Sequence, residues 1–391
     1  MIQKFQFEGV PIKMWASALD DYGWKEVKNL AKLPFAFRHI ALMPDAHAGK
    51  GMPIGAILAA KNAIIPNAVG VDIGCGICAL KSDIKISDLT PEIIRKKIMR
   101  GIRRQIPIGR DSHKQRQDEN LMPQGFDLDK TIIVKRKYLS ALKQIGTLGG
   151  GNHFIELQKD AEDNLWVMIH SGSRNLGSTV GEYYNEQAEI LNRQWFSNVD
   201  FDAKLAFLPV QSREAELYRA EMEYCIAFAY ANRKLMMERI KEILSEIFPE
   251  VKYNPIIDIP HNYASNEEHF GEDLIIHRKG AVKAGIGDIG IIPGSQGTKS
   301  YIVEGLGNPE SFCSSSHGAG RKMSRTEAVN TLSLEDEIEM LDAKGIVHTI
   351  RYKKDLEEAS GAYKDIDEVM ENQKDLVKTL VELYPIAVIK A

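Results

Sequence analysis

The hydrophobic and polar positions of the chain alternate in blocks that predict strands separated by turns and a few longer helices. Between residues 36 and 80, short apolar runs such as 55–60 and 63–66 are broken by glycine turns, which predicts strands. Residues 153–157 and 165–169 also predict strands, and strands with glycine turns return between residues 255 and 320. The apolar run 385–389 predicts a further strand.

Three segments show the period of amphipathic helices. Thr90 followed by Pro91 predicts a helix start, with Ile93, Ile94 and Ile98 facing inward. Residues 212–247 carry the clearest helical period, and residues 364–382 predict a second amphipathic helix. Residues 109–138 are polar and lack a period, which predicts a mobile surface loop. Because both halves carry polar motifs, we expect one domain over residues 1–391, of α+β class with mixed β-sheets and peripheral helices.

The composition and net charge limit the kinds of partner that the chain can bind. The chain has 391 residues, of which 44% are hydrophobic, so it can bury a sizeable core. Its formal net charge of −4 is not that of a strongly basic nucleic-acid-binding protein, so any such contact needs a local basic patch. One candidate patch consists of Arg95, Lys96, Lys97, Arg100, Arg103 and Arg104, with Arg110 nearby. The alternative is that these residues form a solvated helix face.

The cysteines and the hydropathy of the chain predict a cytoplasmic protein. Four cysteines in a chain of this length do not make a disulfide framework. The first residues lack the apolar run and small-residue cleavage site of a signal peptide. No stretch of about 18 uncharged apolar residues occurs, so we expect no membrane span.

Four short segments offer metal ligands at the ends of predicted strands. Asp72 and Cys75 share a glycine-flanked turn, and His153 follows a run of three glycines. His170 and His261 each follow an apolar run. Each could instead be structural: a buried cysteine in a turn, or a histidine satisfied at a sheet edge. Together the donors suit manganese, zinc, iron or cobalt better than magnesium or calcium, and a thiolate can bridge two cations.

A fifth segment, 314–321, places His317 in a glycine turn, where backbone N–H groups can hold a phosphate. A neutral imidazole nitrogen is a competent nucleophile toward phosphorus. The segment 292–297 is another glycine turn with hydroxyl and amide groups. Both could also be ordinary loop turns.

The segments around Asp72, Asn152, His170, His261, Ser295 and His317 resemble, in the same order, those of the RtcB family of RNA ligases. The resemblance covers nearly the whole chain and implies an RtcB-like fold. It implies a GTP- and manganese-dependent ligase that joins an RNA 3′-phosphate or 2′,3′-cyclic phosphate to a 5′-hydroxyl, in RNA repair or tRNA splicing. His317 would carry GMP, and Arg174 would act at the RNA end. RNA with these ends is the implied partner, and an archease-like activator is left open.

The same resemblance implies two manganese ions and a guanine-nucleotide site. Asp72, Cys75 and His153 would hold one ion, and Cys75, His170 and His261 the other, with Cys75 bridging. The implied nucleotide-binding residues are Asn152, His153, Phe154, Ile155, Glu156, His261, Asn262, Pro293, Gly294, Ser295, Gln296, Ser300, His317, Gly318, Ala319, Gly320, Tyr363 and Lys390.

Two departures from the family pattern concern the surroundings of the site. Residues 44–51 replace the usual Pro-Asp-Val-His-Leu-Gly pattern, and Gln296 stands where methionine is common. Neither removes an implied ligand or the nucleophile. Two alternatives remain: a two-metal RNA phosphoesterase without guanylation, and an inactive RNA-binding member of the family.

Overall fold

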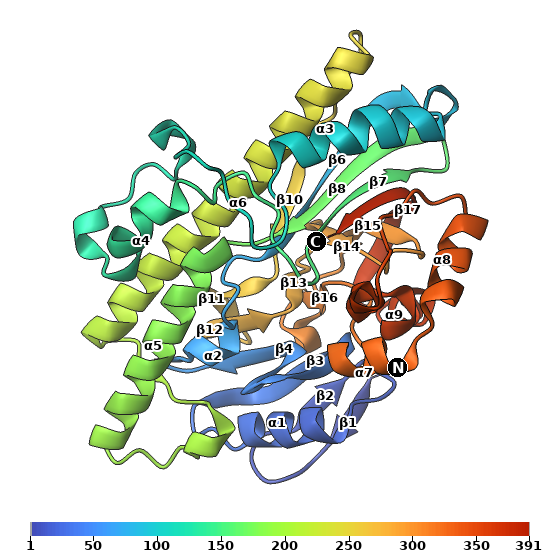
Figure 1. Cartoon of the computed structure of the whole chain (residues 1–391). Coiled ribbons are helices and arrows are strands. Elements are labelled where there is room, and N and C mark those ends of the chain that lie inside the picture. The colour runs from blue at the N-terminus through green and yellow to red at the C-terminus, as the bar shows by residue number, and fades with distance from the viewer. Residues whose placement is uncertain (1, 391) are drawn as a thin grey trace.

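The computed structural model describes residues 2–390 and is built around two large β-sheets (Figure 1). One sheet has seven strands in the order β10-β6-β8-β7-β17-β15-β14, and the other has six in the order β1-β2-β3-β4-β12-β11. Within the described residues, β2 and β3 pair in parallel and the other strand pairs are antiparallel. The predicted α+β class with mixed sheets is therefore confirmed.

Most of the predicted strands are present. The seven-stranded sheet contains β10 (Ile257–Pro260), β6 (Gly76–Lys85), β8 (Asn164–Ser171), β7 (Phe154–Lys159), β17 (Val377–Lys390), β15 (Ser300–Gly305) and β14 (Ile289–Ile292). The six-stranded sheet contains β1 (Gln3–Phe5), β2 (Ile12–Met14), β3 (Ala36–Lys50), β4 (Met52–Ala60), β12 (Glu272–Lys279) and β11 (Asn262–His269). Two short pairs are β13 (Ala281–Lys283) with β16 (Ser314–Ser316), and β5 (Ala63–Ile64) with β9 (Leu208–Pro209).

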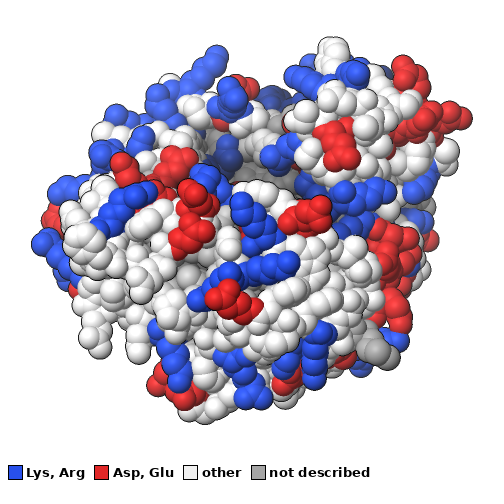
Figure 2. Space-filling view, turned by 90° about the horizontal axis from the view of Figure 1, so that it is seen from below, with Lys and Arg blue, Asp and Glu red and all other residues white. Residues whose placement is uncertain are grey.

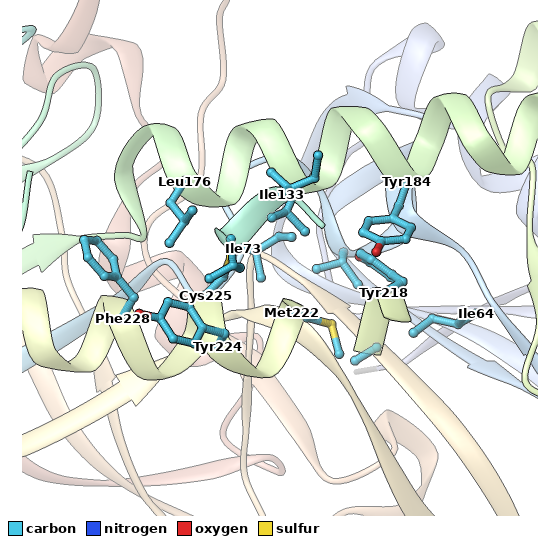
Figure 3. Packing of buried hydrophobic residues seen from close by; sticks show 14 of the residues in the cluster. Ile64, Ile73, Ile133, Leu176, Tyr184, Tyr218, Met222, Tyr224, Cys225 and Phe228 are labelled. Carbon is cyan, nitrogen blue, oxygen red and sulfur yellow. The ribbon is translucent and has the colours of Figure 1, made fainter. Parts of the chain in front are cut away.

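Two long helices cover one side of the molecule (Figure 1). Helix α6 (Arg213–Ile247) matches the predicted helix, and its N-cap Ser212 accepts a hydrogen bond from the Ala215 N–H. It packs against α5 (Arg174–Gln194) through buried side chains that include Leu176, Tyr184 and Tyr218 (Figure 3). Each such side chain contributes roughly 1.5–3 kcal/mol when fully buried, so this contact anchors both helices.

The other helices are shorter. They are α1 (Asp21–Ala31), α2 (Pro66–Val69), α3 (Arg100–Gln105), α4 (Ile133–Ala141), α7 (Arg325–Thr331), α8 (Leu334–Ala343) and α9 (Ile366–Glu371). The helix predicted from Thr90 is present: Thr90 Oγ1 accepts the Ile93 N–H at 3.2 Å, and a π-helical stretch, Ile93–Met99, leads into α3. Ile94 and Ile98 are buried as predicted, whereas Ile93 is only half-buried. No helix within residues 2–390 combines the length and apolar character needed to cross a membrane.

The predicted helix over residues 364–382 is wrong beyond its first turns. Asp365 caps α9, but this helix ends at Glu371, and β17 begins at Val377. The strand pairs with β15 on one side and with β7 on the other, so both edges are hydrogen-bonded. Hydrogen bonding to these two strands outweighs the helical period of the apolar residues. The local sequence pattern could not predict it, because both partner strands are distant in the sequence.

The predicted loop over residues 109–138 extends too far. Helix α4 begins at Ile133, and the buried Glu221 carboxylate accepts the backbone N–H groups of Ile132, Ile133 and Val134. A buried carboxylate at a helix N-terminus is stabilised by those unpaired N–H groups. The partner lies on α6, so the sequence around residue 133 contains no sign of it.

Candidate active site

The predicted metal ligands meet at one edge of the seven-stranded sheet. Strands β10, β6, β8 and β7 are neighbours and run alternately in opposite directions. The end of one strand therefore lies beside the start of the next. Cys75 directly precedes β6, His153 precedes β7, His170 lies at the end of β8, and His261 follows β10. Antiparallel pairing thus gathers residues that are far apart in the sequence.

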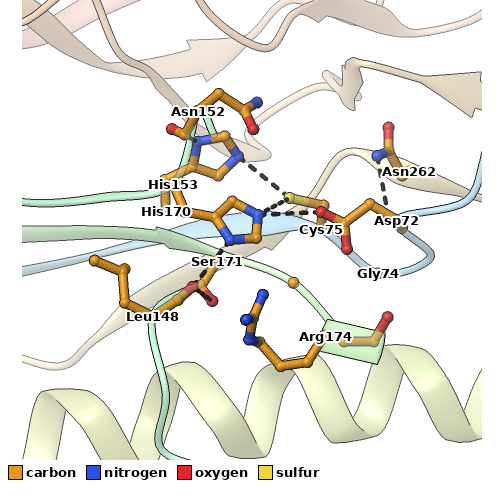
Figure 4. A network of polar contacts seen from close by, with 12 residues as sticks. Asp72, Gly74, Cys75, Leu148, Asn152, His153, His170, Ser171, Arg174 and Asn262 are labelled. Atoms are coloured by element: carbon orange, nitrogen blue, oxygen red, sulfur yellow. Dashed lines mark hydrogen bonds and ion pairs between the residues drawn. The ribbon is translucent and has the colours of Figure 1, made fainter. Parts of the chain in front are cut away.

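The side chains of Cys75, His153 and His170 point toward one another (Figure 4). Cys75 Sγ lies 3.4 Å from His153 Nε2 and 3.3 Å from His170 Nε2. Asp72 Oδ2 lies 3.1 Å from His153 Nε2, and His170 Nε2 lies 3.3 Å from His261 Nε2. One carboxylate, one thiol and three imidazoles therefore form a continuous cluster of donors.

The protonation states of these side chains leave lone pairs available to bind a cation. His153 Nδ1–H donates to the Leu148 carbonyl at 2.9 Å and His170 Nδ1–H to the Asn152 carbonyl at 3.1 Å, which leaves each Nε2 lone pair facing the cluster. Burial lowers the pKa of His170 and of His261, so both rings are neutral. Burial also raises the pKa of the Cys75 thiol, and a bound cation would reverse this by stabilising the thiolate. The residues therefore fit a transition-metal site of mixed oxygen, nitrogen and sulfur donors.

His317 lies next to this cluster. It follows β16, and its ring centroid is 4.7 Å from that of His261. Its Nδ1–H donates to Asp45 Oδ2 at 2.6 Å, and the same oxygen accepts the His317 backbone N–H at 3.1 Å. Asp45 is fully buried and lies on β3. Because Nδ1 carries the proton, Nε2 retains the lone pair that a nucleophile needs.

His317 opens onto a cavity of about 880 Å³ that also contains Asp72, Cys75, His170 and His261. Most of the predicted nucleotide-binding residues line this cavity: Asn152, Phe154, Glu156, His261, Asn262, Pro293, Gly294, Ser295, Gln296, His317, Gly318, Ala319, Gly320, Tyr363 and Lys390. The other three do not. His153 contacts Cys75 within the donor cluster, Ile155 packs into the core, and Ser300 Oγ accepts hydrogen bonds from Gln158 and the Gly294 N–H.

Two glycines are required where the chain packs most closely in the site. Gly149 has a φ of 96°, and a Cβ atom there would lie 2.1 Å from an Arg174 guanidinium nitrogen. Gly320 has a φ of 73°, and its Cβ would lie 2.2 Å from the Asp45 carbonyl oxygen. Any side chain at either position would displace a group of the site.

Arg174 begins α5, and its guanidinium points toward Asp72 and the histidines (Figure 4). Its Nε–H donates to Thr147 Oγ1 and another guanidinium N–H to the Gly109 carbonyl, both at 3.2 Å. Burial lowers the pKa of Arg174 somewhat, and attraction by Asp72 and Cys75 opposes this. The arginine is therefore held beside the donor cluster, although it does not line the cavity itself.

Glu358 contacts three polar residues of the cavity wall: Tyr363, Lys390 and Arg325. Its carboxylate accepts a hydrogen bond from the Tyr363 hydroxyl, and it lies 3.3 Å from Lys390 Nζ and 2.9 Å from Arg325 Nε. Burial opposes ionisation of Glu358, but these partners hold its pKa at about 2. Gln296 donates to the Glu358 carbonyl at 2.7 Å, which gives the departure at this position a structural role. The sequence analysis did not identify Glu358.

Two buried residues of α6 support the donor cluster from behind, and neither was identified from sequence. Arg233 donates to the carbonyls of Gly74 and Ser171, at 3.1 and 2.9 Å, and pairs with Asp258. Asn232 donates to Ser171 Oγ at 3.1 Å. These residues fix the turn before β6 and the end of β8. The only signal in the sequence is a polar pair within an otherwise apolar helical period.

Comparisons with known proteins identify the family of this chain. A family model described as tRNA-splicing ligase RtcB matches residues 26–391. The RNA-splicing ligase RtcB of Escherichia coli (strain K12) is 39% identical, over 98% of this chain and 98% of that protein. The tRNA-splicing ligase RtcB of Pyrobaculum aerophilum is 29% identical, over 97% and 95% of the two chains. A match of this extent confirms the resemblance seen in the motifs: the chain belongs to the RtcB family of RNA ligases.

Proposed function

We propose that this protein is a GTP- and manganese-dependent RNA ligase that joins an RNA 3′-phosphate or 2′,3′-cyclic phosphate to a 5′-hydroxyl through a histidine–GMP intermediate. Its relatives are named RNA-splicing and tRNA-splicing ligases. The observation that carries the proposal is the position of His317, which has its Nδ1–H held by Asp45 while its ring lies in a cavity beside a cluster of metal donors.

The donor cluster is where the metal would be held. Asp72, Cys75 and His153 would bind one manganese ion, and Cys75, His170 and His261 a second. When bound, manganese would polarise phosphate oxygens and lower the pKa of an attacking hydroxyl or water.

His317 would perform the first chemical step. Its Nε2 attacks the α-phosphorus of GTP, a nitrogen–phosphorus bond forms, and the bond from that phosphorus to the bridging oxygen breaks as pyrophosphate leaves. The ring gains positive charge in this step, and the Asp45 carboxylate offsets that charge through the Nδ1–H.

The next steps transfer the nucleotide to RNA. An oxygen of the RNA 3′-phosphate attacks the phosphorus of the histidine–GMP, and the electron pair of the broken bond returns to Nε2. A 2′,3′-cyclic phosphate is first opened by water. The 5′-hydroxyl then attacks the activated 3′-phosphate, its proton passes to solvent, GMP leaves, and the phosphodiester forms. Arg174 would hold a phosphate of the RNA end, because its planar fork matches phosphate oxygens.

Labelling with α-³²P-GTP tests this function. We expect a protein-bound label that needs manganese, disappears with a chelator and is absent from the His317→Ala variant. That variant should fold normally, because the side chain lies at a cavity wall and its loss leaves no core void. A two-metal phosphoesterase would gain no label, and a label retained by His317→Ala would overturn the assignment of the nucleophile.

A further inference from the structure

The segment from Pro91 to Arg116 is much more basic than the rest of the chain. It contains nine Lys and Arg residues and two acidic ones, a net charge of +7, so the remainder carries −11 of the total of −4. All nine basic side chains are exposed. On the face shown in Figure 2, by contrast, basic and acidic side chains are interspersed.

The backbone of this segment is fixed by its apolar face. Ile94, Ile98, Ile102 and Ile106 recur every four residues and are buried in one core cluster with Ile240 and other side chains of α6. Because that face is held against the core, the charged face points away from it. The positive charges are therefore presented on a rigid support.

Few of these charges are neutralised. Among residues 2–390, the only ion pair of the nine basic residues joins Lys96 to Glu92, and both of those side chains are largely exposed. Partial burial, together with repulsion by Arg351 from the loop after α8, lowers the pKa of Arg103. Basic side chains that lack a carboxylate partner within residues 2–390 favour an external anion.

The basic segment runs directly to the active site. The Gly109 N–H donates to the Gly149 carbonyl at 2.8 Å, in the glycine run that leads to His153. The Gly109 carbonyl accepts from Arg174. Arg110 therefore directly follows the residue that contacts Arg174. Arg104 and Arg100 lie further from the active site along α3.

We propose that the exposed basic face of residues 95–110 binds the phosphate backbone of the RNA strand whose end lies at Arg174. This inference rests on the proposed ligase function and adds the path of its substrate. As an α-helix, Arg95 to Gln105 would span about 15 Å, and its π-helical first part makes it slightly shorter. This length still matches about four stacked nucleotides at roughly 3.4 Å each. A solvated helix face is the competing interpretation.

The test compares two variants that each remove two positive charges. Arg100→Gln/Arg104→Gln alters the basic face, and Lys25→Gln/Lys28→Gln alters α1, which lies at the opposite end of the molecule (Figure 1). Binding of a 20-nucleotide RNA with a 3′-phosphate is measured against salt concentration, without GTP. Each lost phosphate contact lowers the slope of log K against log salt by about 0.7, so we expect a decrease of about 1.4 for the α3 variant and none for the α1 variant.

Guanylation with labelled GTP, measured on the same preparations, separates this inference from the proposed function. Neither pair of residues lines the cavity, so we expect normal labelling in both variants. Two outcomes would overturn the RNA path but leave the ligase function intact. One is normal labelling with an unchanged salt slope in the α3 variant, and the other is an equal decrease of the salt slope in both variants. Absence of label in the unaltered protein would instead overturn the function. A four-nucleotide RNA should bind the unaltered protein more tightly than a two-nucleotide RNA, and equal affinities would also contradict the path.

Discussion

Asp45 Oδ2 accepts two hydrogen bonds from the same residue, one from the ring Nδ1–H of His317 at 2.6 Å and one from its backbone N–H at 3.1 Å. The two bonds fix both the tautomer of the imidazole and the turn that carries it. Since Asp45 is on β3 and His317 follows β16, the pair also joins the six-stranded sheet to the two-stranded β13–β16 sheet.

Replacing Asp45 by Asn should slow guanylation far more than it affects folding. The amide keeps the shape of the side chain but loses the charge that stabilises the ring after attack and that fixes its tautomer. Loss of a carboxylate in such a position lowers a catalytic rate by about 10²–10⁴-fold. Single-turnover labelling measures this, with the exposed Asp273→Asn as the control. A normal rate in Asp45→Asn would show that the carboxylate has no such role.

Cys75→Ala should remove bound manganese, whereas Cys78→Ala should keep it. Cys75 contacts two histidines of the donor cluster, while Cys78 is buried in the apolar core with Leu80 and Ile169. Loss of Cys78 is therefore expected to lower the free energy of unfolding by about 1 kcal/mol without affecting the metal. Metal content after gel filtration and denaturant unfolding of both variants check this. Retention of manganese by Cys75→Ala together with its loss from Cys78→Ala would reverse the assignment.

The buried Glu156 should make stability fall as the pH rises. Burial raises the pKa of Glu156 to about 8, from 4.5. Between these values the folded protein holds a proton that the unfolded chain has lost, so this contribution to stability is complete below pH 4.5 and is lost as the pH approaches 8. As the pH rises from 5 to 8, the free energy of unfolding of Glu156→Gln should therefore increase by on the order of 2–5 kcal/mol relative to that of the unaltered protein. Unfolding at several pH values measures this, and parallel stability curves for the two proteins would contradict it.

The RNA ends used should be a 3′-phosphate and a 5′-hydroxyl. The nucleotide would be carried by a histidine beside metal donors, and its phosphorus can be attacked by a phosphate oxygen. One pair of oligonucleotides carries 3′-phosphate and 5′-hydroxyl ends, and the other carries 3′-hydroxyl and 5′-phosphate ends. With manganese and GTP we expect joining of the first pair only. Ligation of the second pair, or of the first without GTP, would show that the mechanism is wrong.

Much of the site could be predicted because its residues lie where strands begin or end. His170 and His261 follow apolar runs that are β8 and β10, and the glycine run before His153 leads into β7. Asp45 lies in the segment 44–51 that departs from the family pattern, and its role could not be predicted from sequence. Its contact with His317 spans 272 positions and depends on how β3 passes the β13–β16 sheet.

The features of the fold that could not be predicted from sequence depend on contacts between residues far apart in the chain. Val377 and Leu380 continue the apparent helical period of the preceding residues, yet β17 forms because β7 and β15 supply hydrogen bonds on both of its sides. Arg233 and Asn232 appear as polar interruptions of α6 until the turn before β6 is placed beside them. Local sequence patterns indicate propensity and burial. The pairing of β17 and the contacts of Arg233 and Asn232 become visible only in the assembled structure.

The interior place of β17 has a consequence for how the protein acquires activity. This strand comes after all the others in the sequence, yet it lies between β7 and β15 and ends with Lys390 beside Phe154. During synthesis the two parts of the seven-stranded sheet therefore remain unjoined until residues 377–390 have left the ribosome. A chain interrupted before that point would contain every metal donor and His317, but it would lack the strand that unites the sheet. If His317 is guanylated as proposed, we therefore expect guanylation to require residues 377–390.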